Sequence, residues 1–481
     1  MVTMHPILDC WDHLLRRDAQ RIVVVHGEGE LRATVGDVDR LARDAARRLS
    51  SLPAGGVVLL EGDAGPGFLA ALLACWRGGL TPALAPASGQ ETTRAALGQA
   101  LGCCGVARLI GDWPADEWLV CTRANTSGTT MPAPPGGAPG VLKLTSGSSG
   151  APRAVHTTAE QLAADDRALT ATMGLDEGDR ILAAIPLNHS YGLASVALPP
   201  LVRGAAIVQP SRGNPFAPAQ AACRHQVTFL PTTPAYLAAL VAARRPPPVP
   251  SSLRLVISAG APLTAATAEA FRATYGLAVH TFYGSSETGG ITFDRRGGAA
   301  ERGTVGEPVE GVEVSLQPLS AGDRRDPGQG TVVVRSPAVA SGYFPTVDER
   351  LGDGRFVTGD LGRFSDDGRG VELALLGRTD RVLNLRGRKL DPRELESIVE
   401  SLSGVREAAA LQIRGEDGAP GALRLVVAGD ADLPDAARLR DFLHRRLPPH
   451  ERPRSVVFVT ELPRNERGKI DFAAMQRPDF R

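Results

Sequence analysis

The sequence contains very little lysine. Of its 53 basic residues, only Lys143, Lys389 and Lys469 are lysine, and all the others are arginine. Together with the alanine, glycine and proline content, this indicates a GC-rich coding bias. A lysine that persists under such a bias is a candidate for a position where arginine fails, because lysine is a compact point charge and arginine a planar fork.

Several classes of protein are excluded by what else is missing. The 53 acidic residues balance the basic ones, and a net charge of zero argues against a nucleic-acid partner. The longest strongly apolar run, Phe68–Trp76, is about half of the ~20 residues that a membrane span needs. The six cysteines have no paired spacing, so we expect no zinc or disulfide framework but a cytoplasmic protein with reduced thiols. The first residues, Met1–His5, do not resemble a secretory signal.

The length and patterning predict more than one domain. A chain of 481 residues exceeds the roughly 250–300 residues at which a single core stops growing. Strand-like and helix-like segments alternate up to about residue 300, which is typical of parallel sheets covered by helices. The predicted fold class is α/β: a large N-terminal domain (1–379) of two α/β subdomains plus a small β-barrel-like sheet at about 301–377, followed by a small mobile C-terminal α+β domain (380–481).

The clearest motif is a loop of glycines and hydroxyls that follows an apolar strand and precedes a helix starting near Thr158. Its residues are Thr145, Ser146, Gly147, Ser148, Ser149 and Gly150, with Arg153 just beyond. Glycines let successive backbone N–H groups turn toward one anion, and hydroxyls add donors. The pattern GxxxxGK[ST] is absent. We interpret the loop as a phosphate site; the alternative is a Ser/Gly-rich linker.

Residues Thr145–Arg153 resemble the phosphate loop of the adenylate-forming enzymes, which include acyl- and aryl-CoA synthetases, peptide-synthetase adenylation domains and luciferases. That family usually has lysine in the place of Arg153 and glycine in the place of Ala154. The resemblance extends from Leu31–Val38 to Lys469 through five motifs in the same order. It implies ATP and Mg²⁺ as cofactors.

Two of these motifs imply how the nucleotide is held. Ser258–Leu263 is similar to the segment beside the adenine, and Tyr283–Thr288 is similar to the family motif YGxTE. The residues implied are Gly260, Ala261 and Pro262 beside the purine, Tyr283 and Gly284 at its stacking face, Ser286 at the α-phosphate, and Glu287 as the Mg²⁺ ligand. The last role suits a carboxylate, because a hard cation takes oxygen ligands and phosphates supply the rest.

Two later motifs extend the implied site. Thr358–Asp360 is similar to the family's TGD, whose aspartate binds the ribose hydroxyls; by itself TGD is also a common β-turn. In the motif GRxD that follows, Arg378 is implied in ribose or phosphate contact, and Asp380 is implied as the hinge between the domains.

Two of the three lysines, Lys469 and Lys389, lie in motifs and have implied roles in the two half-reactions. Lys469, in a segment similar to PxxxxGK, is implied to bridge the substrate carboxylate and the α-phosphate, where charge grows in the transition state. The loop that contains Gly387 and Lys389 is implied in thiol binding, although Lys389 is equally well interpreted as a surface charge. We find no role for Lys143.

The acid-binding residues are implied by Pro186–Leu193 and by the glycines after Glu287. The predicted acyl pocket consists of His189, Tyr191, Gly192, Ser258, Gly289 and Gly290, with His189 also a candidate catalytic residue and the two later glycines leaving room. A structural histidine is the alternative for His189. No acidic residue lies between Pro186 and Gly204, so an α-ammonium would be buried unpaired. An aryl or acyl acid is expected rather than an α-amino acid.

The resemblance implies a two-step ligase. ATP and a carboxylate give an acyl-adenylate and pyrophosphate, without a general base because a carboxylate is already ionised at neutral pH. A thiol then captures the acyl group. CoA is the expected thiol; a separate phosphopantetheinyl carrier protein is the alternative, since only twelve residues follow Lys469. A luciferase-like oxygenase and a catalytically impaired nucleotide-binding homologue are further alternatives.

Overall fold

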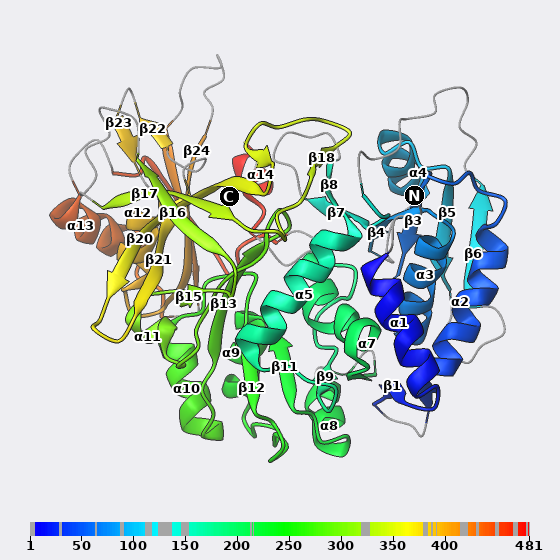
Figure 1. Ribbon diagram of the computed structural model, residues 1–481. Coiled ribbons are helices and arrows are strands. Elements are labelled where there is room, and N and C mark those ends of the chain that lie inside the picture. Colours follow the sequence, from blue (N-terminus) through cyan, green and yellow to red (C-terminus); the bar gives the residue numbers. More distant parts are fainter. Residues whose placement is uncertain are drawn as a thin grey trace. The chain divides into compact units, whose positions relative to one another are not determined.

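The computed structural model (Figure 1) describes residues 5–27, 31–62, 65–86, 91–110, 118–123, 137–145, 153–211, 214, 216–318, 328–378, 383–385, 388–390, 392–413, 422–429, 432–447, 452–464, 470–477 and 480. The chain forms two compact units. The first comprises Met1–Gln317, Val332–Thr358 and Phe364–Ala374, and the second comprises Pro318–Thr331, Gly359–Arg363 and Leu375–Arg481. The domain boundary that we predict between 379 and 380 lies outside the described residues and stays a prediction.

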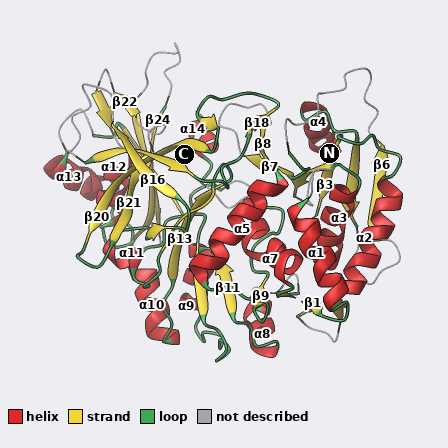
Figure 2. Ribbon diagram, viewed as in Figure 1, coloured by secondary structure: helices red, strands yellow, loops and turns green. Residues whose placement is uncertain are grey.

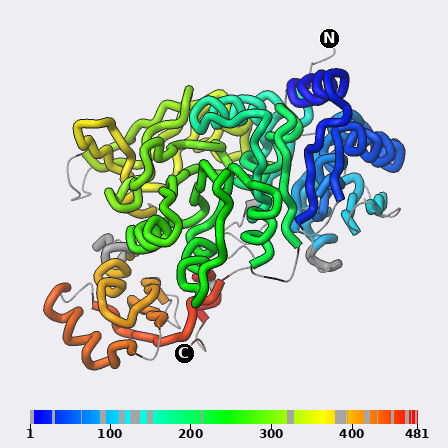
Figure 3. Tube along the Cα trace, turned by 90° about the horizontal axis from the view of Figure 1, so that it is seen from below, coloured from blue at the N-terminus to red at the C-terminus, as the bar shows by residue number. Residues whose placement is uncertain are grey.

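A nine-stranded sheet is the largest element of the first unit. Its spatial order is β15 (Glu307–Pro308), β14 (Gly289–Phe293), β13 (His280–Ser285), β12 (Leu255–Ser258), β11 (Phe229–Thr232), β9 (Arg180–Leu182), β10 (Ala206–Gln209), β1 (Ile22–His26) and β2 (Arg32–Thr34). The six strands from β13 to β1 are parallel, and antiparallel strands flank them at both edges. Strand β1 pairs with β10 although they are distant in the sequence, as the blue and green tubes show (Figure 3).

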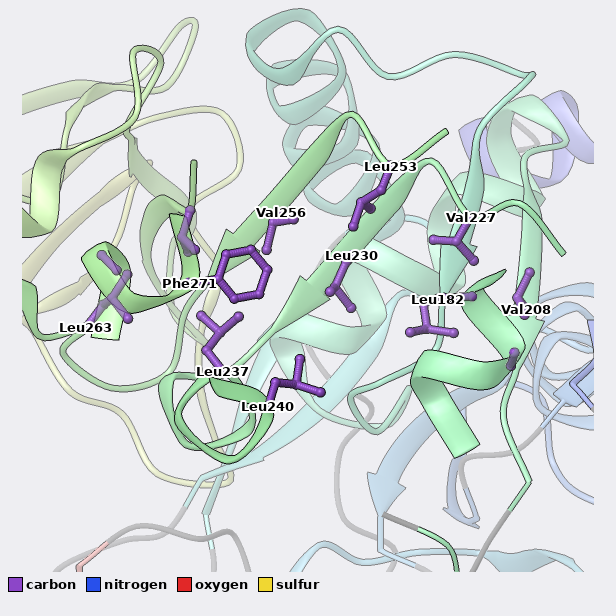
Figure 4. Close-up of a cluster of buried hydrophobic side chains, with 14 residues drawn as sticks. Leu182, Val208, Val227, Leu230, Leu237, Leu240, Leu253, Val256, Leu263 and Phe271 are labelled. Carbon is purple, nitrogen blue, oxygen red and sulfur yellow. The ribbon is translucent and has the colours of Figure 1, made fainter. Parts of the chain in front are cut away.

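Helices α8 (Ala217–Arg224), α9 (Pro234–Ala242) and α10 (Ala265–Tyr275) enclose a hydrophobic cluster on one face of this sheet. In Figure 4, Leu230 and Val256 lie on β11 and β12, and Leu237 and Phe271 lie on the helices; all four are at most 4% exposed. Alternate residues of a strand point to opposite faces, so this cluster fixes which face each following residue occupies.

A seven-stranded sheet carries the strands on either side of the glycine–hydroxyl loop. Its order is β18 (Gly342–Phe344), β8 (Arg153–Thr157), β7 (Val141–Thr145), β4 (Thr81–Ala85), β3 (Val57–Glu61), β5 (Gly105–Leu109) and β6 (Leu119–Arg123). The helices of this part are α1 (Pro6–Arg17), α2 (Val35–Leu49), α3 (Gly65–Arg77) and α4 (Glu91–Ala100). Helix α3 is buried along almost its whole length, in keeping with its nearly continuous apolar sequence.

Helix α5 (Ala159–Met173) begins at a capping box, in which the Thr158 hydroxyl accepts from Gln161 N and the Gln161 side chain accepts from Thr158 N. Its middle part packs beside β14. The shorter helical segments of the first unit are α6 (Ser190–Gly192), a π-helical turn at Leu193–Ala197, α7 (Leu198–Arg203) and α11 (Ala299–Arg302). Figure 2 shows how helices and strands alternate, as expected for an α/β fold.

The small sheet predicted near 301–377 is five-stranded. It has the order β16 (Glu313–Pro318), β17 (Gln329–Arg335), β20 (Arg355–Asp366) and β19 (Leu351–Gly352), with β21 (Val371–Arg378) also paired to β20. Next along the chain are β22 (Leu383–Leu385) and β23 (Arg388–Leu390), which form a two-stranded ribbon.

The last part of the second unit is a three-stranded sheet with helices on both faces. Its elements are α12 (Pro392–Glu400), β24 (Val405–Gln412), β25 (Leu423–Gly429), α13 (Ala436–Arg446), β26 (Ser455–Val459) and α14 (Phe472–Gln476). Leu395 and Leu439 bury α12 and α13 against one face, and Met475 buries α14 against the other. This confirms the predicted α+β character of the C-terminal part.

Two exclusions made from composition can be compared with the structure. None of the described helices combines the length and the apolar character that crossing a membrane requires. All six cysteines are free thiols.

Candidate active site

The predicted phosphate loop connects two paired strands. Strands β7 and β8 are antiparallel, and Thr145 and Arg153 form the last pair of their register. The backbone therefore brings the two ends of the loop together. Residues Ser146, Gly147, Ser148, Ser149 and Gly150 lie outside the described residues, so their predicted role as phosphate donors stays a prediction.

Arg153, the residue just beyond the predicted phosphate loop, lies against an aromatic ring. Its guanidinium carbon is 4.3 Å from the centroid of the Tyr343 ring, and its Nη1 is 3.8 Å from Asp348 Oδ2. Tyr343 belongs to β18, the neighbour of β8, where it is in register with Val155. A planar guanidinium stacks on an aromatic face in a way that a lysine ammonium does not.

The same tyrosine holds the predicted metal ligand. The Tyr343 hydroxyl donates to Glu287 Oε1 over 2.8 Å. Burial, together with the Glu287 charge, raises the pKa of Tyr343, so the phenol stays protonated and remains a donor. Sequence reasoning missed Tyr343 because an aromatic residue in a short strand carries no signal of such a contact.

The backbone around Glu287 is fixed by its neighbours. Glu287 N donates to the Ser285 hydroxyl over 3.2 Å, which forms a local turn, and Ala340 N donates to the Glu287 carbonyl over 2.8 Å. Mg²⁺ is commonly held by one or two carboxylates together with substrate phosphates, and a single positioned Glu287 suits that donor set. Among the described residues, no group of three histidine, cysteine or acidic side chains forms a separate metal centre.

A pair of hydroxyls joins the predicted acid and phosphate segments. Ser190 Oγ and Ser286 Oγ are 2.7 Å apart, although they come from α6 and from the turn after β13. Ser286 is the predicted donor to the α-phosphate. Sequence reasoning did not select Ser190, whose neighbours His189 and Tyr191 belong to the predicted acyl pocket.

The segment Pro186–Leu193 is held at several points. The Asn188 side chain donates to the Ala85 carbonyl over 2.7 Å, and His189 is the N-cap residue of α6. The Tyr191 hydroxyl accepts from Thr232 N over 3.0 Å, so the tyrosine is anchored at the end of β11. A Cβ at Gly192 would lie only 1.9 Å from the Pro186 carbonyl oxygen. Glycine is therefore required at position 192 for backbone packing.

The two glycines after Glu287, Gly289 and Gly290, pack closely against helix α5. Gly289 has φ +70°, and a Cβ there would lie 2.3 Å from Asp165 Oδ1. A Cβ at Gly290 would lie 2.7 Å from Leu169 Cδ2. Helix α5 therefore fills the side on which each glycine lacks a side chain, and the predicted place of the two glycines in the acyl pocket stays a prediction.

Ser258 has its side chain on the face of the sheet opposite the Phe282 ring. It is in register with Thr281, and the next residue, Phe282, has its ring centroid 5.9 Å from that of Tyr191. Since successive residues of a strand point to opposite faces, Ser258 and Tyr191 are separated by the sheet. The predicted place of Ser258 in the acyl pocket stays a prediction.

Ser258 belongs instead to a row of three hydroxyls that the sequence did not reveal. Thr232, Ser258 and Thr281 are in register on β11, β12 and β13, and each is less than one tenth exposed. Within the described part of the chain, none of the three hydroxyl oxygens has a hydrogen-bond partner. The signal available in the sequence was a hydroxyl residue in each of three consecutive strands, at the last position of β11 and of β12 and at the second position of β13.

The predicted purine segments follow neighbouring parallel strands. Gly260, Ala261 and Pro262 are exposed residues after β12, and the partly exposed Tyr283 lies in β13. Carboxyl ends of adjacent parallel strands lie at the same edge of a sheet, which is the usual ligand-binding edge of such folds. The structure thus brings these residues to one edge, with exposed Gly284 next to Tyr283.

In the second unit, the residues predicted to hold the ribose meet. Arg378 Nη1 donates to Asp360 Oδ1 over 3.2 Å, which joins the TGD and GRxD motifs. Lys469, Asp380 and Gly387 lie outside the described residues. For Lys389 the structure describes the backbone, which pairs with Asn384 between β23 and β22. The predicted roles of these four residues stay predictions.

Comparison with known proteins places the chain in a family. The AMP-binding enzyme family matches residues 11–344, and the AMP-binding enzyme C-terminal domain matches residues 394–469. A sulfoacetate–CoA ligase of Cupriavidus necator is 31% identical over 346 residues, which cover 71% of this chain and 67% of that protein. An anthranilate–CoA ligase of Pseudomonas aeruginosa is 29% identical over 410 residues, covering 82% and 75%.

Solved structures show the same fold. ATP-bound MatB from Rhodopseudomonas palustris has a TM-score of 0.81 at 21% identity, covering 99% of this chain and 98% of that chain. The o-succinylbenzoate CoA synthetase of Bacillus subtilis, in complex with its acyl-adenylate intermediate, has a TM-score of 0.78 at 21% identity, covering 98% and 97%. The family match covers more than half of the chain. The chain belongs to the AMP-binding enzyme family, the adenylate-forming enzymes.

Proposed function

We propose that this protein is an AMP-forming acid–CoA ligase that activates an aryl or acyl carboxylic acid. The single observation that carries the proposal is the joining of three segments in the first unit. Glu287 is held by Tyr343, and its neighbour Ser286 is held by Ser190 of the acid segment. The turn that carries the proposed metal-binding carboxylate and phosphate donor is thus joined by one hydrogen bond to β18 and by another to the acid-binding segment.

In the first half-reaction, a carboxylate oxygen attacks the α-phosphate of ATP and pyrophosphate leaves. Our proposal assigns the triphosphate to the loop Thr145–Gly150, the α-phosphate to Ser286, and the metal to Glu287. Mg²⁺, when bound, supplies positive charge that offsets the charge of the phosphate oxygens. The chain's own residues contribute alignment, since the attacking carboxylate is already ionised at neutral pH.

The remaining roles come from the motif resemblance. Lys469 stabilises the charge that grows on the carboxylate and phosphate oxygens. Asp360 accepts hydrogen bonds from the ribose hydroxyls, and Arg378, which donates to Asp360 over 3.2 Å, orients it. Asp380 serves as the hinge. In the second half-reaction a thiol attacks the acyl-adenylate carbonyl, AMP leaves, and the loop with Gly387 and Lys389 receives the thiol substrate.

The acceptor is CoA in this proposal, because the relatives described above are named as CoA ligases. A separate phosphopantetheinyl carrier protein is the competing acceptor. The acid carries no α-ammonium group, because Pro186–Gly204 contains no acidic residue that could pair with it. Free thiols throughout suit a reducing compartment, and we place the reaction in the cytoplasm.

Pyrophosphate exchange tests the proposal directly. The enzyme is incubated with MgATP, labelled pyrophosphate and a panel of aryl, short-chain and long-chain acids. Acid-dependent exchange is expected for at least one class, and none with α-amino acids. Thioester formation is then measured with CoA and with a loaded carrier protein as alternative acceptors. ATP binding without exchange for any acid contradicts the proposed activity.

A further inference from the structure

The Tyr191 hydroxyl is hydrogen-bonded to the main chain of two strands. It accepts from Thr232 N over 3.0 Å, and its proton faces the carbonyl oxygens of Thr232 and Ile257 at 3.2 Å and 3.3 Å. Thr232 is the last residue of β11, and Ile257 is the second to last residue of β12. A side chain of the short helix α6 therefore contacts the carboxyl ends of two adjacent parallel strands.

These contacts use the hydrogen-bonding capacity of the phenol. A tyrosine hydroxyl has one proton to donate, and in Tyr191 both the donor and the acceptor role are taken by backbone groups. Burial raises the pKa of Tyr191 well above its ordinary value, so the phenol stays protonated and keeps its donor role. The motif resemblance assigns Tyr191 to the acyl pocket, yet the hydroxyl that could bind a polar acid is already occupied.

The Tyr191 ring contacts a third strand. Its centroid is 5.9 Å from that of Phe282, which lies in β13, the strand that leads into the turn with Ser286. This contact belongs to the ring and is independent of the hydroxyl. Removing the hydroxyl alone therefore leaves the aromatic packing in place and tests the hydrogen bonds to β11 and β12 by themselves.

Tyr191 is also next to the residue that contacts the predicted phosphate donor. Ser190 Oγ is 2.7 Å from Ser286 Oγ. Leu193 N donates to the His189 carbonyl over 2.7 Å, which closes a helical turn around Ser190 and Tyr191. Because one closed turn carries both residues, a displacement of Tyr191 is passed to Ser190, and from there to the contact with Ser286.

We propose that the Tyr191 hydroxyl anchors α6 to the ends of β11 and β12, so that Ser190 meets Ser286, and that it makes no contact with the acid. Tyr191 is thus a positioning residue for the adenylation step. A polar substituent on the acid gains no hydrogen bond from it. The inference rests on the proposed function in one respect, which is the role of Ser286 as the donor to the α-phosphate.

The test is a double-mutant cycle of Tyr191→Phe and Ser190→Ala in the full-length protein. Pyrophosphate exchange is measured with MgATP varied, using two aryl acids that differ only in a ring hydroxyl. MgATP binding is measured by calorimetric titration, and stability by thermal unfolding. Tyr236→Phe is the matched control, because Tyr236 lies in α9, directly after β11, and its buried hydroxyl has no partner among the described residues.

Tyr191→Phe is expected to lower kcat/KM for MgATP about 3- to 10-fold, by the same factor with either acid, and to lower Tm by roughly 2–4 °C. The double variant is expected to lose no more than the weaker of the two single variants, since both substitutions act through Ser286. Independent losses would instead multiply. Tyr236→Phe is expected to leave exchange and MgATP binding unchanged.

Three results overturn the proposal. A loss seen only with the hydroxylated acid makes the Tyr191 hydroxyl a substrate contact. Losses that multiply in the double variant show that Tyr191 does not act through Ser190. A lowered Tm with exchange at the wild-type rate reduces the hydrogen bonds to a purely structural role. If the wild-type protein exchanges pyrophosphate with no acid, the proposed function fails, while coupling between Tyr191→Phe and Ser190→Ala in the MgATP Kd still decides whether Tyr191 is an anchor.

Discussion

Replacing Tyr343 with phenylalanine removes the hydroxyl that donates to Glu287 and leaves the ring on which Arg153 stacks. The substitution therefore tests one hydrogen bond with little change in packing. Tyr343 is 8% exposed, and its bond to Glu287 Oε1 is 2.8 Å long. A hydrogen bond to a charged group contributes about 1.5–3 kcal/mol.

The effect on catalysis follows from this magnitude. About 1.4 kcal/mol corresponds to a tenfold change in rate. If the whole free energy of the lost hydrogen bond stabilises the transition state, kcat/KM for MgATP decreases about 10- to 100-fold. The loss should appear as a raised Mg²⁺ requirement and a raised KM for MgATP, because the carboxylate is no longer held in one orientation. The assay is pyrophosphate exchange at saturating acid with MgATP varied.

The matched control is Tyr275→Phe. Tyr275 is in the same unit, and its buried hydroxyl has no hydrogen-bond partner within the described residues, so its removal should leave exchange unchanged. The reasoning is refuted if Tyr343→Phe exchanges pyrophosphate at the wild-type rate over the whole MgATP range while Glu287→Gln is impaired. That result would mean that Glu287 acts without the orientation that Tyr343 provides.

Three other predictions concern separate parts of the chain. Lys469→Ala should lower adenylation about 10²–10³-fold, the cost of one strong transition-state donor, and exchange at the wild-type rate would remove Lys469 from the mechanism. Ser190→Ala should lower kcat/KM for MgATP about 3- to 10-fold, because Ser286 loses its hydrogen-bond partner. Ser195→Ala is the control and should leave kcat/KM unchanged, since the buried Ser195 hydroxyl has no partner in the described chain. Equal effects of the two substitutions would mean that packing alone, and not the hydrogen bond, is responsible. Burial opposes the ionisation of Glu372, but hydrogen bonds from nearby arginine and threonine side chains outweigh it and lower its pKa to about 2. Its stabilisation is thus present above its ordinary pKa and is lost as pH falls through about 2, so in urea unfolding Glu372→Gln should destabilise the protein at pH 7 and much less at pH 2; a gap that is constant with pH would contradict this.

The sequence predicted the elements with strong periodicity and clear ends. The helix predicted to start near Thr158 is α5 (Ala159–Met173), because Thr158 and Gln161 form a capping box and an apolar face follows. The parallel strands were found with their ends shifted by a few residues. Strand β9 (Arg180–Leu182), for example, ends where its pairing with β10 and β11 stops, and that point is a tertiary property.

The features of the candidate site that the sequence did not predict have one physical cause. Motif order gives neighbours along the chain, but which face a side chain occupies depends on register and on packing from other elements. Ser258 was grouped with Tyr191, yet its register with Thr281 places it across the sheet. Gly289 was expected to leave room, yet Asp165 from a helix more than a hundred residues earlier occupies that space. Neither fact has a local signal.

Arg153 in β8 and Lys143 in β7 are two cations whose surroundings differ in exposure and in neighbouring groups. The Arg153 side chain is 29% exposed, with the flat Tyr343 ring on one side to receive a planar guanidinium. Lys143 is 6% exposed, and its compensating charges act from a distance. A guanidinium has five donors that need partners, whereas an ammonium needs fewer and takes less space. Drift toward arginine is therefore tolerated where a stacking surface and some solvent exist. The enclosed position 143 suits the smaller ammonium, and the stacked position 153 suits the planar guanidinium.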